Sequence, residues 1–229
     1  MKQVNTAMYH ILKQKRKTVS IYVEDDLSVV VKVPQYLSDK HIHEVITDYK
    51  QKIEKMRAKK ESARQKNDWR ITNSILYLGE PKEIELIPTS SHKAHVKLAD
   101  DKLIISLLNP ESIKQAEVLI EAFFKEQAKI KLTKLTEKYT SLLGLKYGSI
   151  SIRKQKTRWG SCSSKGNLSY NVKLMGAKEE MIEYIVLHEV MHLRHFNHGK
   201  DFWADIEKIM PDYEDRARYF KRFGQDFIL

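Results

Sequence analysis

The residues best suited to chemistry begin at His188. The stretch His188-Glu189-Val190-Met191-His192 has the H-E-x-x-H pattern. On a helix the two histidines lie one turn apart with their rings on the same side, and the glutamate is rotated by about 100° from the first of them. Such a helix supplies two imidazole ligands for a metal ion and a carboxylate that acts on a bound water instead of coordinating the ion. The pattern therefore predicts a metal-dependent hydrolytic site.

A third histidine, His198, follows the pattern and directly precedes Gly199. Its spacing is that of zinc hydrolases whose third ligand comes after the helix has turned. Three neutral imidazoles leave one position of a zinc ion open to water, whose pKa then falls to about 7. We therefore expect Zn²⁺ to be held by His188, His192 and His198, with Glu189 as the base that activates the zinc-bound water.

Other side chains near the pattern offer alternatives. His195 lies on the same helical stripe but about 10 Å along the axis from His188, so we expect it to support the site or to face solvent. Asp205 or Glu207 could instead be a carboxylate third ligand, as glutamate is in other zinc hydrolases. A purely structural zinc site is disfavoured, because such sites generally use four protein ligands.

The metal ligands require a largely buried helix, which we predict over residues 178–196 because apolar residues surround the histidine stripe. A hairpin of residues 158–161 and 168–171 should lead into this helix. Two further helices, at 200–210 and 212–223, should follow it, divided by Pro211.

The rest of the chain mixes strand and helix patterns. Alternating apolar residues predict a β-hairpin at 18–33, and helical spacing after Ser38 predicts a long amphipathic helix. Four strand-like runs between 74 and 108 predict an antiparallel meander. Asn109-Pro110-Glu111 predicts the start of a helix that ends at Gly144. The fold class is therefore expected to be α+β, with an antiparallel β-rich N-terminal part.

Charge and cysteine content limit the partners. Lys and Arg number 41 against 30 Asp and Glu, a formal charge of +11, which favours nucleotides or DNA as candidate partners but also occurs on merely soluble proteins. Cys162 is the only cysteine, which excludes an intramolecular disulfide and a cysteine-based structural zinc site. This thiol is either a small buried side chain or an inhibitory ligand of the metal. Without an apolar leader or a membrane-spanning run, we expect a cytoplasmic protein.

Three stretches of sequence carry a resemblance to a known family. They read RWGSCSS at 158–164, GNLS at 166–169 and HEVMHLRHFNHGKDFW at 188–203. The chain resembles the YgjP-like metallopeptidase family over about residues 76–223, most strongly from residue 158 onward. The resemblance implies a zincin fold, zinc bound by the three histidines, a glutamate base, and a peptide or protein substrate. His195 departs from the longer zincin motif, which commonly has glycine there. The ending HGKDFW is also similar to SprT-like proteases, some of which cleave proteins crosslinked to DNA.

These observations lead to one preferred interpretation. We expect residues 1–75 to form a β-hairpin and a long helix, and residues 76–229 to form a zincin-like metallohydrolase domain that cleaves peptides. Hydrolysis of nucleoside triphosphates, with which some YgjP-like proteins have been associated, a DNA-associated SprT-like protease and a nucleic-acid-binding module with a structural zinc remain alternatives. Residues 157–171 are expected to form a wall of the substrate cleft. Arg158, Tyr170 and Arg216 are candidates for the cleft or for stabilising the oxyanion, although Arg158 fits a structural ion pair equally well.

Overall fold

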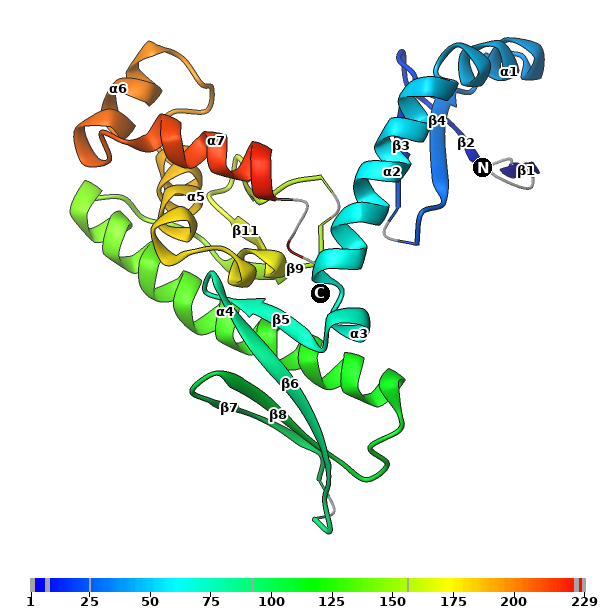
Figure 1. The fold of residues 1–229 in the computed structure, drawn as a ribbon. Coiled ribbons are helices and arrows are strands. Elements are labelled where there is room, and N and C mark those ends of the chain that lie inside the picture. Colours follow the sequence, from blue (N-terminus) through cyan, green and yellow to red (C-terminus); the bar gives the residue numbers. More distant parts are fainter. Residues whose placement is uncertain are drawn as a thin grey trace. The chain divides into compact units, whose positions relative to one another are not determined.

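The computed structural model describes residues 3–6, 9–24, 26–91, 93–155, 157–224 and 227, with residues 3–6 described by their backbone. It has an α+β architecture, as the sequence predicts (Figure 1). The chain forms two compact units, Met1–Lys66 and Asn67–Leu229, each with a hydrophobic core of its own. Within the described residues, no helix is both long enough and apolar enough to cross a membrane.

The N-terminal unit contains a four-stranded sheet in the order β1-β2-β4-β3. Its strands are β1 (Gln3–Thr6), β2 (Tyr9–Gln14), β3 (Ser20–Val23) and β4 (Val29–Pro34). The antiparallel pairing of β3 with β4 confirms the predicted hairpin, whereas β2 runs parallel to β4. Strand β4 is central, and its side chains Val29, Val31 and Val33 are at most 1% exposed. This strand therefore forms the middle of the small core.

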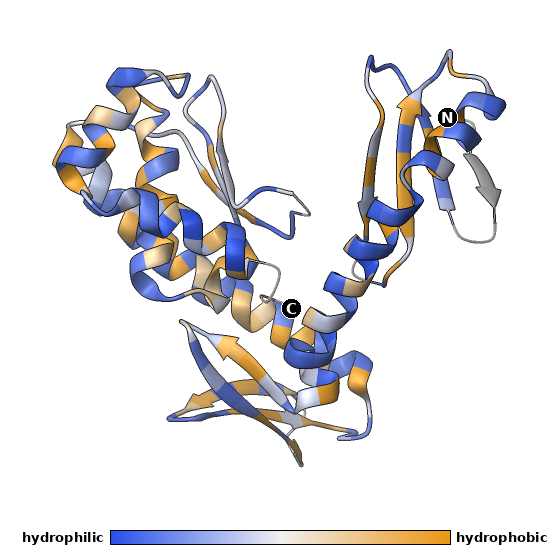
Figure 2. Ribbon diagram, turned by 45° about the horizontal axis from the view of Figure 1, so that its top comes forward, coloured by the Kyte–Doolittle hydropathy of each residue, from blue (hydrophilic) through white to orange (hydrophobic). Residues whose placement is uncertain are grey.

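Two helices cover this core where the sequence predicts one. Helix α1 (Asp39–Asp48) begins at Ser38, whose hydroxyl accepts a hydrogen bond from the backbone N–H of His41, as expected of an N-cap. Tyr49 separates it from α2 (Lys50–Asn67). Only two side chains of α2 are buried, Ile53 and Ala63, and the helix is mostly hydrophilic in Figure 2. Most of α2 therefore faces solvent.

The C-terminal unit begins with the short helix α3 (Trp69–Thr72) and a four-stranded sheet in the order β5-β6-β8-β7. The strands are β5 (Ser74–Tyr77), β6 (Glu80–Pro88), β7 (His95–Ala99) and β8 (Lys102–Leu107). Two antiparallel hairpins form locally, but β6 and β8 pair in parallel, so the predicted meander is wrong. The reason is that β8 turns back after β7 and lies between β6 and β7 in the sheet. Strand periodicity does not reveal which strands pair with each other.

The long helix α4 (Ile113–Leu143) spans the C-terminal unit. It begins at Ser112, so the predicted start at Asn109 is wrong. The side chain of Asn109 instead accepts a hydrogen bond from the backbone N–H of Glu111 at 3.0 Å and closes a turn before the helix. The predicted end is confirmed, because Gly144 adopts the left-handed conformation with φ of 65°.

The remaining elements surround the H-E-x-x-H stretch. A three-stranded sheet in the order β10-β11-β9 contains β9 (Ile150–Arg153), β10 (Gly160–Cys162) and β11 (Leu168–Asn171). The antiparallel pair β10–β11 confirms the second predicted hairpin. A 3₁₀ helix, η1 (Val172–Gly176), then leads to α5 (Glu179–Met191), α6 (Lys200–Ile209) and α7 (Tyr213–Phe223). Helix α5 packs against α4, which holds its buried face in the core.

Candidate metal centre

Helix α5 positions the first two histidines at its carboxyl end. Ile182, Val186 and Val190 are fully buried, so the helix is fixed in the core up to its last turn. His188 belongs to that turn, and His192 is the C-cap residue. The helix ends before the predicted residue 196, and the chain then turns back. This turn carries His198 to a position just before α6, whose N-cap is Gly199.

The three histidine rings converge on one point. One ligand atom from each of His188, His192 and His198 can be chosen so that all lie within 4.8 Å of one another. The Nε2 atoms of His188 and His198 are 3.0 Å apart. Nitrogens that share a tetrahedral zinc at 2.0–2.1 Å lie about 3.3 Å from each other, so this spacing suits a common ion. Within the described residues, no Asp, Glu or Cys joins this group.

The protonation of the rings favours metal binding. Burial, and then the proximity of His192 and His198, lower the pKa of His188 to about 3. The pKa of His198 is also lowered, first by burial and then by His192. Because a metal binds the neutral imidazole, rings that resist protonation are ready to act as ligands.

A hydrogen bond fixes the orientation of His192. Its Nδ1 lies 3.0 Å from the carbonyl oxygen of His195, to which it donates when Nε2 is unprotonated. The lone pair of Nε2 is then available to a metal, as is usual for ligands oriented by a backbone carbonyl. His195 therefore supports the site through its main chain, in line with one of the two roles expected for it.

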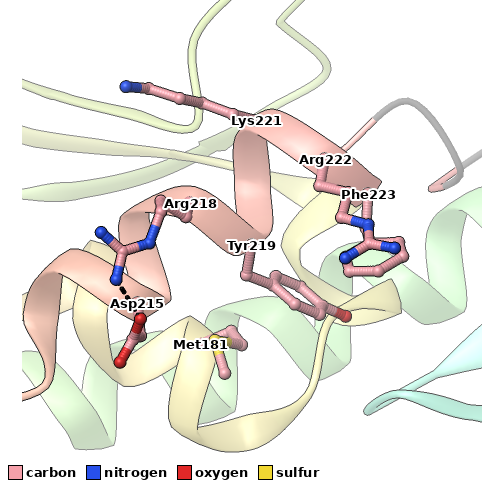
Figure 3. A pocket seen from close by; sticks show the side chains of 7 residues that line it. All are labelled: Met181, Asp215, Arg218, Tyr219, Lys221, Arg222 and Phe223. Atoms are coloured by element: carbon pink, nitrogen blue, oxygen red, sulfur yellow. Dashed lines mark hydrogen bonds and ion pairs between the residues drawn. The ribbon is translucent and has the colours of Figure 1, made fainter.

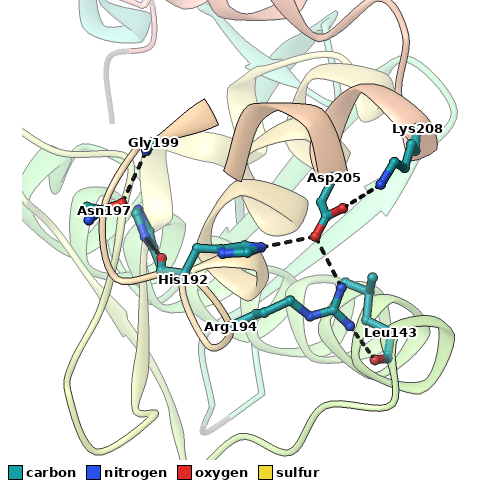
Figure 4. Close-up of polar contacts among 8 residues, drawn as sticks. Leu143, His192, Arg194, Asn197, Gly199, Asp205 and Lys208 are labelled. Carbon is teal, nitrogen blue, oxygen red and sulfur yellow. Dashed lines mark hydrogen bonds and ion pairs between the residues drawn. The ribbon is translucent and has the colours of Figure 1, made fainter. Parts of the chain in front are cut away.

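Asp205 holds this turn in place from α6 (Figure 4). Its carboxylate lies 3.0 Å from Nε2 of His195, 3.3 Å from Arg194 and 2.9 Å from Lys208. These partners, with His195 first, hold the pKa of Asp205 well below its usual range. Arg194 also donates to the carbonyl oxygen of Leu143, at the end of α4. Asp205 is thus engaged in supporting the turn, and the alternative that it or Glu207 is the third ligand finds no support in the geometry.

Glu189 lies in a confined, water-poor position. It is 6% exposed, and burial raises its pKa to about 7 although the nearby Arg158 acts in the opposite direction. The backbone of β10 passes directly against it. A Cβ added to Gly160 would lie 2.5 Å from Cγ and 2.7 Å from Oε1 of Glu189. Gly160 therefore makes room for this carboxylate, a role missed from the sequence although glycine within a strand often marks such an approach.

Aromatic side chains of α6 surround the histidines. Phe202 is 1% exposed, and its ring centroid lies 4.8–5.1 Å from those of the three histidines. Trp203 stacks on His198 at 5.6 Å and on Tyr213 at 5.3 Å. Phe202 and Trp203 both belong to the HGKDFW motif, but their contacts with the histidine rings were not predicted. Their helical spacing from His198 was the signal that could have placed them beside the metal ligands.

The predicted cleft residues have different surroundings. Arg158 is exposed and lies near enough to Glu189 to influence the pKa of its carboxyl group. Its role in a substrate cleft stays a prediction. Tyr170 is fully buried, and its hydroxyl lies 2.9 Å from that of Thr136. Arg216 donates to the carboxylate of Asp212 and to the carbonyl oxygen of Glu180. The polar groups of Tyr170 and Arg216 are therefore engaged in packing the unit together.

Comparisons with known proteins found a matching family model and two similar solved structures. The family model of the YgjP-like metallopeptidase domain matches residues 17–223, which includes most of the N-terminal unit. No curated protein matches the chain. The metallopeptidase zymogen of Pyrococcus abyssi abylysin is 23% identical, with 42% of this chain and 99% of that chain covered at a TM-score of 0.38. The zymogen of Methanocaldococcus jannaschii jannalysin is 21% identical, with 38% and 85% covered at a TM-score of 0.35.

Proposed function

The chain belongs to the YgjP-like metallopeptidase family, and from this premise we propose that it is a zinc-dependent peptidase with Glu189 as its catalytic base. His188, His192 and His198 are the zinc ligands in this proposal. One observation carries it: ligand atoms of three histidines meet within 4.8 Å beside a buried glutamate. Since every residue of this centre lies beyond residue 76, we assign the metallohydrolase domain to residues 76–229.

The donor set suits zinc at a catalytic centre. Imidazole is a preferred zinc ligand, and three protein ligands instead of four are typical of sites that act on a substrate. Bound there, zinc would polarise the carbonyl group of the substrate and lower the pKa of water. Burial and the neighbouring histidines lower the pKa of His188 to about 3 and also lower the pKa of His198, so a positive charge on these two rings is opposed at neutral pH.

Glu189 performs the proton transfers. A carboxyl group whose pKa is about 7 can accept and release a proton near neutral pH, whereas an ordinary glutamate is a weaker base there. Its carboxylate takes a proton from the attacking water and later delivers it to the nitrogen of the leaving amine. Gly160 keeps the carboxylate in place, and the charge of Arg158 favours its ionised form.

The edge of the β10-β11-β9 sheet suits an extended substrate. Strand β10 pairs with β11 on one side and is the last strand of the order, so within the described residues no strand pairs with its other edge. A peptide that pairs with this edge would run past Gly160 and hence past Glu189. This arrangement supports peptides in extended conformation as the substrate class.

The test compares casein cleavage by the zinc-loaded protein and by Glu189→Gln. The variant preserves the size of the side chain and removes the base, so we expect the cleavage rate to fall by about 10²–10⁴-fold while the zinc content stays the same. Undiminished cleavage by a variant that still holds zinc would contradict the role of Glu189. If the wild-type protein does not cleave casein, the proposal that peptides are its substrates is contradicted.

A second candidate function is hydrolysis of nucleoside triphosphates. It is favoured by Arg158, an exposed cation beside Glu189 that could bind a phosphate group. Release of phosphate or pyrophosphate from nucleotides, with casein left intact and with the activity lost in Glu189→Gln, would favour this candidate over peptide cleavage.

A further inference from the structure

A pocket of about 520 Å³ lies in the N-terminal unit. One wall comes from the edge strand β3 and the residues before it, with Thr18, Val19 and Ile21. The other comes from the helices, with Tyr49, Lys52 and Met56. Its size and mostly apolar lining are those of ligand-binding pockets. None of its residues belongs to the metal centre or to the proposed mechanism.

Tyr49 offers an exposed aromatic ring, and the ammonium group of Lys52 lies over one of its two faces. Tyr49 stands between α1 and α2 and is 46% exposed, although it is a large aromatic residue. The Nζ atom of Lys52 lies 5.4 Å from the centre of its ring. An exposed aromatic ring next to a positive charge suits a ligand that has both a flat base and a phosphate group.

Unpaired positive charge leads away from the pocket along α2. Lys52, Lys55 and Lys59 follow each other at spacings of three and four residues, so they share one stripe of the helix, and all are exposed. None of these three lies in a salt bridge with another described residue. On the other wall, the exposed Lys15 and Lys17 directly precede Thr18. The pocket is therefore bordered by cations on both sides.

The charge of the whole chain is concentrated in this unit. Residues 1–66 contain 15 Lys and Arg against 8 Asp and Glu, a formal charge of +7 out of +11 for the chain. The surface lysines of the other unit are often paired, as Lys131 is with Glu179 and Lys138 with Glu183. A surplus of unneutralised cations on one small unit is the electrostatic pattern of a protein surface that binds polyanions.

We propose that this pocket binds single-stranded nucleic acid. A base stacks on Tyr49, and the backbone phosphates follow Lys52, Lys55 and Lys59 along α2. A single strand is favoured over a duplex, because stacking on Tyr49 requires an unpaired base. It is favoured over an anionic membrane, because Ile53 and Ala63 are buried and α2 has no apolar face to insert into lipid.

The test measures fluorescence anisotropy of a labelled oligothymidylate of about 16 nucleotides with the full-length protein in EDTA. EDTA separates this binding from the metal centre, so the result stands independently of the peptidase assay. Lys52→Gln/Lys55→Gln/Lys59→Gln should weaken binding at least about tenfold and make the slope of log K against log salt less negative by about 2. Tyr49→Ala should weaken binding about tenfold, and Tyr49→Phe should retain it.

The matched control is Lys97→Gln/Lys134→Gln/Lys146→Gln, which removes the same charge from exposed lysines of the other unit. Binding that is retained in this control but lost in the α2 variant supports the proposal. Absence of binding by the wild-type protein overturns it, as does equal weakening in both triple variants. Equal affinity for a duplex of the same length, or binding to phosphatidylserine vesicles without binding to the oligonucleotide, also overturns it.

Discussion

The two units of the chain treat their ionisable groups in opposite ways. The C-terminal unit buries the groups that carry chemistry, since Glu189 is 6% exposed and burial shifts the pKa of both Glu189 and His188. The N-terminal unit exposes a stripe of lysines on α2 to solvent. A proton-transfer group needs a poorly solvated position, whereas binding a polyanion needs accessible charge. The two roles therefore require different degrees of burial.

The number of buried side chains on each helix explains why one unit buries its ionisable groups and the other exposes them. Helix α5 has eight buried residues and lies in the main core, so it can hold Glu189 away from water. Helix α2 is longer, with 18 residues, but buries only Ile53 and Ala63. A helix with so little buried surface leaves its charged side chains in water, where they keep their charge.

The largest expected effect is on the stability of the metal-free protein. Burial holds Glu189 at a pKa of about 7 instead of 4.5, so the folded state resists ionisation that the unfolded state undergoes. The contribution of Glu189 to stability therefore falls as pH rises from 4.5 to 7. We expect the free energy of unfolding of Glu189→Gln, relative to wild type, to increase by about 3 kcal/mol over this range. Urea unfolding in EDTA at a series of pH values measures it.

His188 gives the opposite trend with pH, because its pKa is lowered. Its contribution to stability is present above pH 6.5 and is lost as pH falls towards 3. Since His188 is common to both proteins, it cancels in the difference. A difference that does not change with pH would mean that Glu189 is not desolvated.

The next effect concerns Gly160. In Gly160→Ala the new methyl group would overlap Glu189, so the carboxylate must move. A displacement of about 1 Å can cost 10²-fold in rate, and we expect a loss of that size in casein cleavage. Ser161→Ala, on the same strand, is the control and should keep most of the activity. An unchanged rate for Gly160→Ala would show that the position of Glu189 does not depend on β10.

A smaller effect is expected at the turn that carries the histidines. Asp205→Ala removes the partner of His195, Arg194 and Lys208, so the carbonyl group that orients His192 becomes less fixed. Loss of such an indirect support typically weakens metal binding by 10–100-fold, and we expect about tenfold. Competition with a chromophoric chelator measures the zinc affinity. Asp201→Ala, on the exposed first turn of α6, is the control, and equal affinities in the two variants would contradict the role of Asp205.

The smallest effect is expected for the surface ion pairs of the C-terminal unit. Lys131 and Glu179 lie 2.8 Å apart, but the carboxylate is largely exposed. A double-mutant cycle with alanine should give a coupling energy below about 1 kcal/mol. A larger value would mean that these pairs stabilise the unit, and would weaken the contrast with Lys52, Lys55 and Lys59 of α2, which form no salt bridge with another described residue.

A pocket in the C-terminal unit shows that positively charged side chains alone do not indicate a binding site. Arg218, Tyr219 and Arg222 of α7 line a pocket of about 590 Å³ (Figure 3). Arg218 is held by Asp215 and Glu214, and Arg222 lies over the ring of Phe223. Arg218 and Arg222 therefore already have partners, whereas Lys55 and Lys59 of α2 form no salt bridge with another described residue.

The sequence predicted the features that depend on local pattern. The presence of helix α5, although not its end, the hairpins β3–β4 and β10–β11, and the end of α4 at Gly144 follow from periodicity and turn residues. The parallel pair β6–β8 joins segments whose sequence shows no preference for each other, so it was missed. The start of α4 was misplaced because Asn and Ser are both residue types that favour the N-cap, and the helix begins after Ser112 although the Ser112 side chain makes no cap hydrogen bond. The approach of Gly160 to Glu189 depends on tertiary packing, which no spacing encodes.

The most direct test of the central claim is the zinc content of four purified proteins measured by elemental analysis. The wild-type protein and Glu189→Gln should each hold one zinc ion per chain, because Glu189 is not a ligand. His192→Ala and His198→Ala should lose most of it, since each removes one of three converging ligands. Equal zinc in all four proteins, or none in the wild type, would contradict the three-histidine centre on which the account depends.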